Sequence, residues 1–231
     1  MATVSHSCQF DLCDGSGFVY DIETNTAYDC RCRAQRVSRA RAHSLSAVIP
    51  RRYRDVAFDR PPANEIDPAI LAATRRYANT IGAQLDAGRG LWFMGPPGTG
   101  KTTLAMLVSK AALAAGRTAA IYSLPRLLNE IRHTFDAGGS HNELLDRLAT
   151  VDLLHIDDVG AERRNDWVLE ELYLLVNARY EDKRSIVLTT NCLDRDELCE
   201  QINARTVSRL TEMCDELPLG GGDHRMELRG A

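Results

Sequence analysis

The chain has 231 residues, of which 44% are hydrophobic and 26% are charged, and its net charge at pH 7 is −4. This composition indicates one globular domain of ordinary size with an appendage, and it excludes a surface that is basic all over. No apolar run approaches the roughly 20 residues that cross a membrane, and the first residues lack the pattern of a signal peptide. Because the chain shows no secretion signal and its seven cysteines are an odd number, we expect reduced thiols and a cytoplasmic location. Because no apolar run spans a membrane, we expect no membrane partner.

Four of the seven cysteines lie in two closely spaced pairs near the start of the chain: Cys8, Cys13, Cys30 and Cys32. Between the pairs, a Gly-Ser-Gly turn, an alternating run at 18–20 and Asn25 predict a β-hairpin. Cysteine pairs that flank a hairpin are typical of a zinc ribbon, in which four thiolates hold the metal. A segment this small needs such a metal to fold. His6 in place of one thiol, or four free thiols, are the alternatives.

A basic stretch follows the cysteines. Between Arg31 and Arg54 there are eight arginines and no acidic residue. Such a block is either a solvated arm or a surface for nucleic acid or an acidic partner. Residues 34–48 have a helical composition, and Pro50 and the later Pro61-Pro62 indicate a linker. We therefore expect a cysteine-rich module and linker helix at 1–45 and a second domain at 46–231. Apolar spacing predicts a helix over 67–85, which ends before Gly88.

Residues 91–102, LWFMGPPGTGKT, are an apolar strand followed by G-x-x-x-x-G-K-T and a helix over 101–115. This is the phosphate-binding P-loop. Its glycines let backbone N–H groups surround a phosphate, and the helix N-terminus adds partial positive charge. Lys101 can reach the β- and γ-phosphates, and the Thr102 hydroxyl can ligate Mg²⁺. The predicted ATP-binding residues are Gly95, Pro96, Pro97, Gly98, Thr99, Gly100, Lys101, Thr102 and Thr103.

Beyond the P-loop, predicted strands alternate with predicted helices. The strands are 118–123, 151–156 and 185–190, and the helices are 124–135, 142–149 and 166–180. This alternation predicts an α/β fold with a central parallel sheet covered on both faces, that is, a three-layer P-loop sandwich. Because few residues follow Asn191, we expect at most a very short C-terminal lid.

Polar residues follow two of these strands. Asp157 and Asp158 end one strand, and Asn191 follows the next. Ligands of open α/β sheets bind at this carboxyl edge. We expect Asp157 to hold Mg²⁺ through water and Asp158 to act as the base that polarises the attacking water. Because Asp is one methylene shorter than Glu, we expect slow hydrolysis. Asn191 can orient the water, and the alternative is that it is a turn residue.

Three late arginines complete the set of candidates. Arg205 and Arg209 are four residues apart, so they share one helix face. Such a pair is commonly solvated or salt-bridged, but in an oligomeric ATPase one such arginine reaches a neighbour's γ-phosphate. Arg225 offers a further cation for the nucleotide of its own chain.

In this order, the P-loop, Asp157-Asp158, Asn191 and the late arginines resemble the AAA+ ATPases. The chain is most similar to the DnaC/DnaI-type replicative helicase loaders, which have IstB-like relatives. The cysteine-rich start and residues 49–53, 153–160, 189–191 and 205–210 carry the resemblance. It implies that Arg209 is the arginine finger, Arg225 the sensor-2 arginine and Asn191 sensor 1. The implied catalytic residues are Asp158, Asn191, Arg209 and Lys101.

The resemblance also implies partners. The helix pair after the second strand of the domain would contact single-stranded DNA through Arg132 and Phe135, since an aromatic ring beside a cation suits a single strand. The alternative is that Phe135 is core and Arg132 is solvated. The cysteine module would bind the replicative helicase. The implied function is ATP-dependent helicase loading in DNA replication initiation, with ATP, Mg²⁺ and structural Zn²⁺ as cofactors and self-association through the ATP site. The alternatives are an IstB-like ATPase that assists a transposase and a nucleotide-regulated adaptor that barely hydrolyses ATP.

Overall fold

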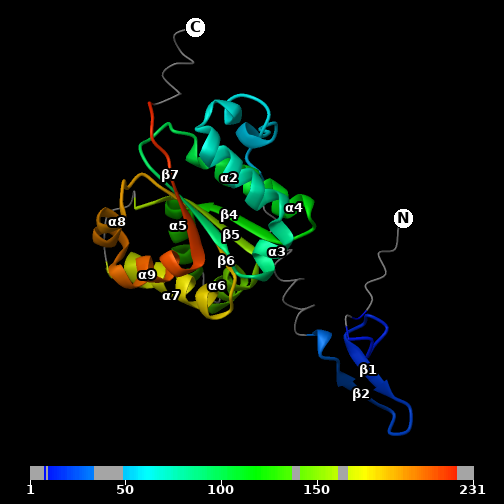
Figure 1. Ribbon diagram of the computed structural model, residues 1–231. Coiled ribbons are helices and arrows are strands. Elements are labelled where there is room, and N and C mark those ends of the chain that lie inside the picture. The colour runs from blue at the N-terminus through cyan, green and yellow to red at the C-terminus, as the bar shows by residue number, and fades with distance from the viewer. Residues whose placement is uncertain (1–7, 9, 34–48, 137–140, 161–165, 223–231) are drawn as a thin grey trace.

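The computed structural model describes residues 8, 10–33, 49–136, 141–160 and 166–222. Its main feature is a five-stranded sheet in the order β4-β5-β6-β3-β7, in which all neighbouring strands are parallel (Figure 1). The prediction of a central parallel sheet is therefore confirmed. The strands are β3 (Gly90–Met94), β4 (Ala119–Ser123), β5 (Leu153–Val159), β6 (Ser185–Thr190) and β7 (Cys214–Pro218).

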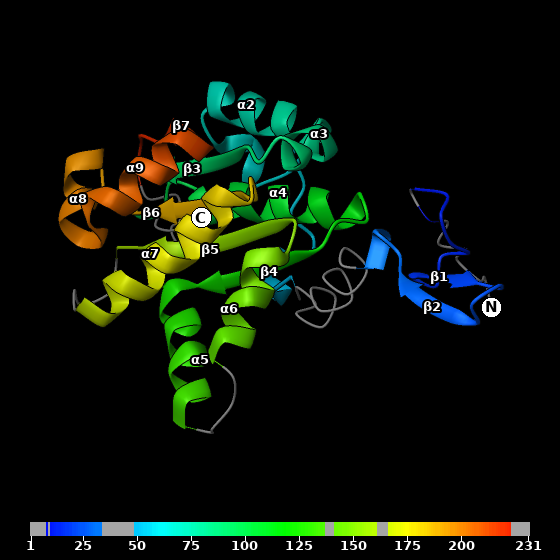
Figure 2. The same ribbon diagram turned by 90° about the horizontal axis from the view of Figure 1, so that it is seen from below.

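Helices cover both faces of this sheet, which makes three layers (Figure 1). One face carries α2 (Pro68–Asn79), α3 (Ile81–Asp86) and α4 (Lys101–Ala114). The other face carries α5 (Leu124–Asp136), α6 (His141–Thr150), α7 (Asp166–Glu181), α8 (Arg195–Ile202) and α9 (Ala204–Met213). Helices α5 and α6 pack side by side at one end of this layer (Figure 2). Parallel strands need this cover because both of their faces are apolar.

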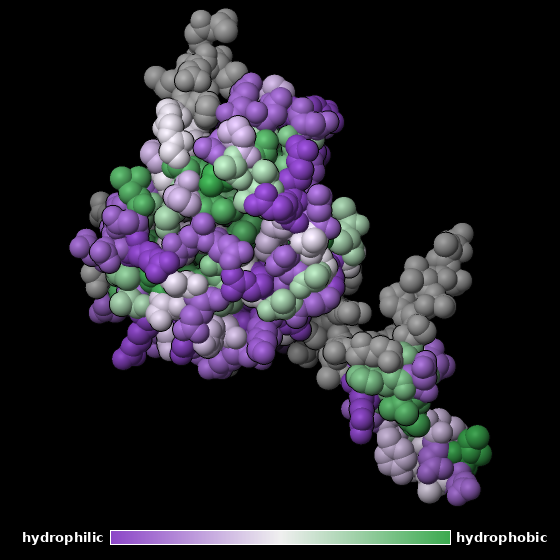
Figure 3. Space-filling view, viewed as in Figure 1, coloured by the Kyte–Doolittle hydropathy of each residue, from purple (hydrophilic) through white to green (hydrophobic). Residues whose placement is uncertain are grey.

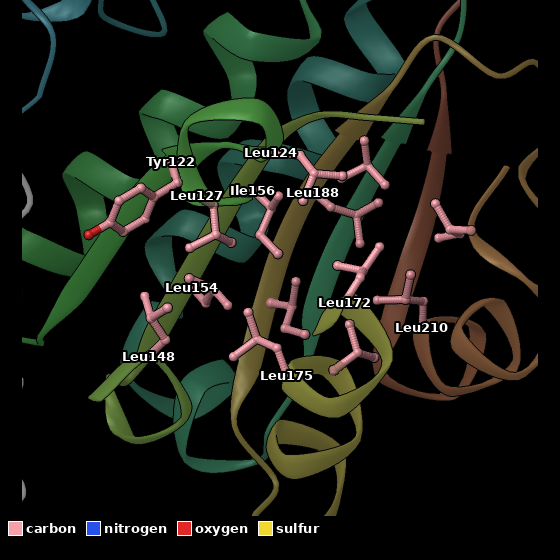
Figure 4. Close-up of a cluster of buried hydrophobic side chains, with 14 of the residues drawn as sticks. Tyr122, Leu124, Leu127, Leu148, Leu154, Ile156, Leu172, Leu175, Leu188 and Leu210 are labelled. Carbon is pink, nitrogen blue, oxygen red and sulfur yellow. The ribbon is translucent and has the colours of Figure 1, made fainter. Parts of the chain in front are cut away.

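The strand residues alternate between the two cores. Trp92 packs in the core under α5–α9, and its neighbour Phe93 packs in the core under α2–α4; both are fully buried. Successive strand residues point to opposite faces, so one apolar run supplies both layers. Figure 4 shows the larger core, where leucines from four helices meet the sheet. Each such side chain contributes about 1.5–3 kcal/mol when it is fully buried.

The helix predicted over 67–85 is two helices, so that prediction was wrong in its middle. Asp67 starts α2 as expected, because its carboxylate accepts hydrogen bonds from the backbone N–H groups of Ala69 and Ile70. The break lies at Thr80, whose hydroxyl donates to the carbonyl of Arg76 four residues earlier. A β-branched residue that bonds back in this way bends a helix.

The carboxyl ends of β3, β5 and β6 meet at one edge of the sheet, which is where the site forms. Strand β5 runs past its predicted end and contains both Asp157 and Asp158, with a shift of register between Ile156 and Val159. Asp158 has φ of +59°, in the left-handed region. Strand β7, which was not predicted, pairs with β3 and follows α9.

The predicted hairpin is present as β1 (Phe18–Asp21) and β2 (Thr26–Asp29), which pair antiparallel. Asn25 has φ of 51°, as expected for the turn residue. Short 3₁₀ turns at Arg51–Tyr53 and Ala63–Glu65 precede α2. Among the described residues, no helix has both the length and the apolar character needed to span a membrane.

Candidate nucleotide-binding site

The loop between β3 and α4 requires glycine at its turns. Gly95 and Gly100 have φ of +138° and +95°. A Cβ on Gly95 would lie 2.0 Å from the carbonyl oxygen of Leu219, and one on Gly100 would lie 2.4 Å from Cδ1 of Ile66. The chain therefore adopts this tight loop only if these two positions lack a side chain. Such a loop lets backbone N–H groups surround a phosphate.

Lys101, at the first turn of α4, is buried in this loop. Its ammonium group donates to the carbonyl oxygens of Gly95 at 2.8 Å and Pro96 at 2.7 Å. These bonds compensate the cost of placing a cation away from water. The loop thus holds a positive charge where the P-loop motif places the phosphates.

Oxygen ligands for a divalent cation lie beside Lys101. The Thr102 hydroxyl donates to Oδ1 of Asp157 at 3.0 Å, and Thr189 donates to the same oxygen at 2.6 Å. Adjacent ligands in an Mg²⁺ octahedron lie about 2.9 Å apart, given Mg–O bonds of about 2.0–2.1 Å. The spacing of the Thr102 and Asp157 oxygens therefore allows both to ligate Mg²⁺ directly, whereas the sequence analysis expected Asp157 to act through water. The backbone N–H of Asp158 donates to Thr189 at 3.0 Å, which ties β5 to β6 at this point.

A cavity of about 540 Å³ contains the predicted site. Asp158 from β5 and Asn191 from the end of β6 line it together with the P-loop, so the sheet edge brings these three motifs to one place. The lining residues are Arg52, Tyr53, Val56, Pro62, Ile66, Pro97, Gly98, Gly100, Lys101, Thr102, Thr103, Asp158 and Asn191.

One wall of the cavity was missed by the sequence analysis. The segment treated there as a linker contributes an apolar surface from Tyr53, Val56 and Ile66, which suits the base of a nucleotide. Lys110 on α4 donates to the carbonyl oxygens of Arg54 at 2.7 Å and Val56 at 2.5 Å, and so holds the segment against the P-loop helix. The available signal was the apolar residues Tyr53, Val56 and Ile66 in the segment before α2.

A buried histidine supports the strand that carries the aspartates. Nδ1 of His155 lies 2.9 Å from the hydroxyl of Ser109 on α4, and the imidazole is fully buried. Burial lowers the pKa of His155 to about 3, so the ring is neutral at pH 7. β5 and α4 are therefore joined by a neutral polar contact two residues before Asp157.

Arg209 lies outside this cavity. On α9, its Nε donates to Oδ1 of Asn177 at 3.3 Å, and its guanidinium lies 4.3 Å from the centre of the Tyr180 ring. With Arg205 it lines a second cavity of about 430 Å³ between α7 and α9. Neither arginine lines the P-loop cavity of its own chain.

The four N-terminal cysteines form one cluster whose sulfur atoms all lie within 4.8 Å of one another. The Sγ atoms are 3.7 Å apart in Cys8–Cys30 and 3.6 Å apart in Cys13–Cys32. A tetrahedral zinc site with Zn–S bonds of about 2.3 Å places its sulfurs about 3.8 Å apart. The cluster therefore fits zinc. Desolvation raises the pKa of Cys8, but backbone N–H groups of residues 10, 12 and 13 outweigh it and bring the pKa to about 6.

Comparison with known proteins gives the family. A family model described as IstB-like ATP binding protein matches residues 33–228. The chain belongs to this family. IstB-like proteins bind ATP by that description, which agrees with a cavity lined by the P-loop residues Lys101 and Thr102.

Relatives of this IstB-like protein include helicase loaders. It is 29% identical over 141 residues to the replicative helicase loader DnaC of Escherichia coli (strain K12), which covers 61% of this chain and 56% of that protein. The chain thus spans little more than half the length of the curated relatives it matches. The crystal structure of the DnaC helicase loader has a TM-score of 0.64 at 27% identity and covers 74% of this chain and all of that one. The crystal structure of DnaI has a TM-score of 0.63 at 22% identity, and the match covers 77% of this chain and 98% of that one. The predicted resemblance to DnaC/DnaI-type AAA+ proteins, fold included, is confirmed.

The remaining predicted residues of the IstB-like protein are spread over the fold. Arg132, exposed on α5, lies 4.9 Å from the ring centre of Trp167 on α7. The side chain of Phe135 and the whole of Arg225 and His6 lie outside the described residues. The cavity therefore unites the P-loop, Asp158 and Asn191, while Arg209, Arg132 and the cysteines lie elsewhere.

Proposed function

We propose that this chain is an ATPase that loads a replicative DNA helicase onto single-stranded DNA during replication initiation. The observation that carries the proposal is the single cavity in which Lys101, Thr102, Asp158 and Asn191 meet. The likeness to proteins named as replicative helicase loaders supports the loading role.

The residues that hydrolyse ATP in this proposal lie at the carboxyl edge of the sheet. Lys101 and the P-loop N–H groups bind the phosphates of ATP, and Thr102 and Asp157 hold Mg²⁺, which supplies charge neutralisation of the β- and γ-phosphates when bound. Asp158 takes the proton of the attacking water, and Asn191 orients that water. Asp158 is exposed at the end of a bulged strand, where its backbone already adopts the left-handed conformation.

Self-association completes the site. Arg209 does not line the cavity of its own chain and contacts Asn177 and Tyr180 instead. We therefore assign it to the γ-phosphate in a neighbouring subunit, where such an arginine accelerates phosphoryl transfer about 10³–10⁵-fold. Arg225 is assigned to the nucleotide of its own chain.

The cysteine module, residues 1–45 with zinc on its four thiolates, is proposed to bind the helicase. The described residues of this module expose six large apolar or aromatic side chains, and Figure 3 shows hydrophobic residues at its surface beside hydrophilic ones. Patches of this kind on so small a unit are typical of protein–protein contacts. They are Phe10, Leu12, Phe18, Tyr20, Ile22 and Tyr28.

Single-stranded DNA is proposed to contact α5 through Arg132 and Phe135. The stacking of Arg132 on Trp167 adds an aromatic ring to this surface, and bases stack on such rings. Arg132→Ala is expected to weaken single-stranded DNA binding and to reduce the slope of log K against log salt by about 0.7. An unchanged slope, measured by fluorescence anisotropy, would remove Arg132 from the interface.

The deciding experiment is mass photometry of this chain with the replicative helicase of its host, with and without Mg-ATP. We expect a complex heavier than the helicase hexamer that is lost on deleting residues 1–33 and, for its ATP-dependent part, in Lys101→Ala. Absence of a complex under every nucleotide condition would reject the loader.

The second candidate is an ATPase that assists a transposase. It is favoured by the description of the family as IstB-like, whose match begins at residue 33, after all four clustered cysteines. A nucleotide-regulated adaptor, the third candidate, predicts ATP binding with almost no turnover, with or without single-stranded DNA. Steady-state ATPase rates separate it from the other two.

A further inference from the structure

Arg209 is held in place by two side chains of α7. Its Nε donates to Asn177, and its guanidinium carbon lies over the Tyr180 ring, 4.3 Å from the ring centre. Both partners come from α7, one turn apart, while Arg209 comes from α9. The Tyr180 side chain also contributes a polar contact with Arg209, besides the hydrogen bond that Arg209 Nε makes to Asn177.

The two partners are themselves fixed. The amide nitrogen of Asn177 donates to Glu181 at 2.9 Å, which turns its oxygen toward Arg209. The hydroxyl of Tyr180 donates to Glu212 at 2.7 Å. This hydrogen bond to the carboxylate raises the pKa of Tyr180, so the ring remains a neutral phenol at pH 7.

We propose that Tyr180 and Asn177 are positioning residues that hold Arg209 ready to engage the γ-phosphate of a neighbouring subunit. This inference rests on the proposed function, in which Arg209 acts in trans. A free arginine side chain loses much rotamer freedom when it is immobilised, and the clamp made by Tyr180 and Asn177 imposes that loss before assembly. The clamp holds Nε and packs the guanidinium on the Tyr180 side chain, and the same guanidinium lines the 430 Å³ cavity, where its fork of N–H groups can meet a phosphate.

The surroundings of the clamp fit an anion. Arg205, one turn before Arg209, lines the same 430 Å³ cavity with Ser208 and Tyr173. Two cations and a hydroxyl around one opening match a phosphate group.

The test is complementation between two inactive proteins in the presence of single-stranded DNA. Arg209→Ala retains an ATP site but has no finger, and Lys101→Ala has no ATP site but retains its finger. Mixing them is expected to restore turnover at the mixed interface. A Lys101→Ala/Tyr180→Leu donor is expected to restore about 2- to 30-fold less turnover, the range set by the strength of cation–π contacts.

Conservative and control donors separate positioning from folding. A donor that carries Lys101→Ala with Tyr180→Phe keeps the ring and is expected to restore most of the turnover. A donor with Asn177→Ala instead is expected to restore a turnover between those of the Tyr180→Phe and Tyr180→Leu donors. Phe58→Leu removes a comparable stack, that of Arg75 on Phe58, and is expected to change nothing. ATP affinity of the Tyr180→Leu single variant is expected to be unchanged, because Tyr180 does not line the P-loop cavity.

Full restoration of turnover by the Tyr180→Leu donor would contradict the positioning role of Tyr180 and would leave the role of Arg209 in trans intact. Failure of the plain Lys101→Ala donor to restore any turnover would instead overturn the finger in trans, and the clamp with it.

Discussion

The nucleotide cavity rests on two large apolar cores, whereas the cysteine cluster has almost no core beneath it. The sheet edge that carries Lys101, Asp158 and Asn191 is held by buried side chains on both faces. In the module, the buried cluster consists of the cysteines themselves with Val19 packed against them. The hydrophobic cores therefore stabilise the nucleotide cavity, whereas the hairpin depends on the cysteine cluster for its own stability. Because a small segment cannot bury enough apolar surface to fold, we expect a zinc ion on these thiolates to replace the core.

This contrast predicts different responses to the loss of a ligand. A sheet held by its core keeps its cavity without nucleotide. A hairpin held by four thiolates loses its order without zinc, because structural zinc contributes about 10–16 kcal/mol of binding free energy.

The largest expected effect is therefore zinc removal. Cys30→Ser, or treatment with a strong chelator, is expected to abolish one equivalent of bound zinc and the order of the hairpin, with ATP affinity unchanged. Zinc content by mass spectrometry and hairpin signals by NMR are the measurements. Cys199→Ser, which changes a cysteine of α8 outside the cluster, is the control. Protein expressed with ample zinc that carries none would contradict the prediction.

The second effect is on catalysis without loss of fold. Asp158→Asn is expected to lower turnover about 10²–10⁴-fold, as for loss of a general base, with ATP affinity nearly unchanged. Stability is expected to hold because Asn tolerates the φ of +59° at this position as well as Asp does. Single-turnover hydrolysis and nucleotide binding measure the two effects, with the exposed Asp182→Asn as control. Equal turnover in the variant would show that another group takes the proton.

The third effect is acid destabilisation of the ATPase region through His155. Its folded pKa of about 3 lies below the ordinary 6.5, so the unfolded state binds the proton first. The contribution of His155 to the free energy of unfolding is complete above pH 6.5 and is lost as the pH falls from 6.5 toward 3. Between pH 7 and pH 5 the loss is about 2 kcal/mol.

Urea denaturation of wild type and His155→Gln at both pH values tests this. The variant is expected to lose about 2 kcal/mol less than wild type between the two pH values, whatever its stability at pH 7. His133→Gln, at an exposed position on α5, is expected to keep the wild-type pH dependence. A His155→Gln variant with that same dependence would assign the acid sensitivity to other groups.

The smallest effect on stability is expected at the surface of the module. Tyr20→Ser is expected to keep zinc and to change the free energy of unfolding by less than about 0.5 kcal/mol, because the side chain is 59% exposed. The same change is expected to weaken the helicase complex at least tenfold, as an aromatic at the centre of an interface does. Leu193→Ser, at another exposed apolar residue, is the control for both measurements. Unchanged helicase binding in Tyr20→Ser would move the contact elsewhere on the module.

Much of the fold followed from local patterns. Strand β6 was predicted at its observed residues, and the helix predicted over 166–180 extends by one residue to Glu181. Errors came where a contact distant in sequence decides the outcome. Nothing local marked Cys214–Pro218 as a strand, since β7 forms by pairing with β3, more than a hundred residues earlier.

The sequence by itself determined the P-loop, the aspartates after a buried strand and the paired cysteines around a hairpin, because each depends on neighbours within a few residues. The tertiary structure alone decided that Tyr53, Val56 and Ile66 wall the cavity, and that Arg209 is stacked on Tyr180 away from it. Such contacts join segments whose separation along the chain carries no periodic signal. They form only when the sheet order and the packing of helices bring those segments together.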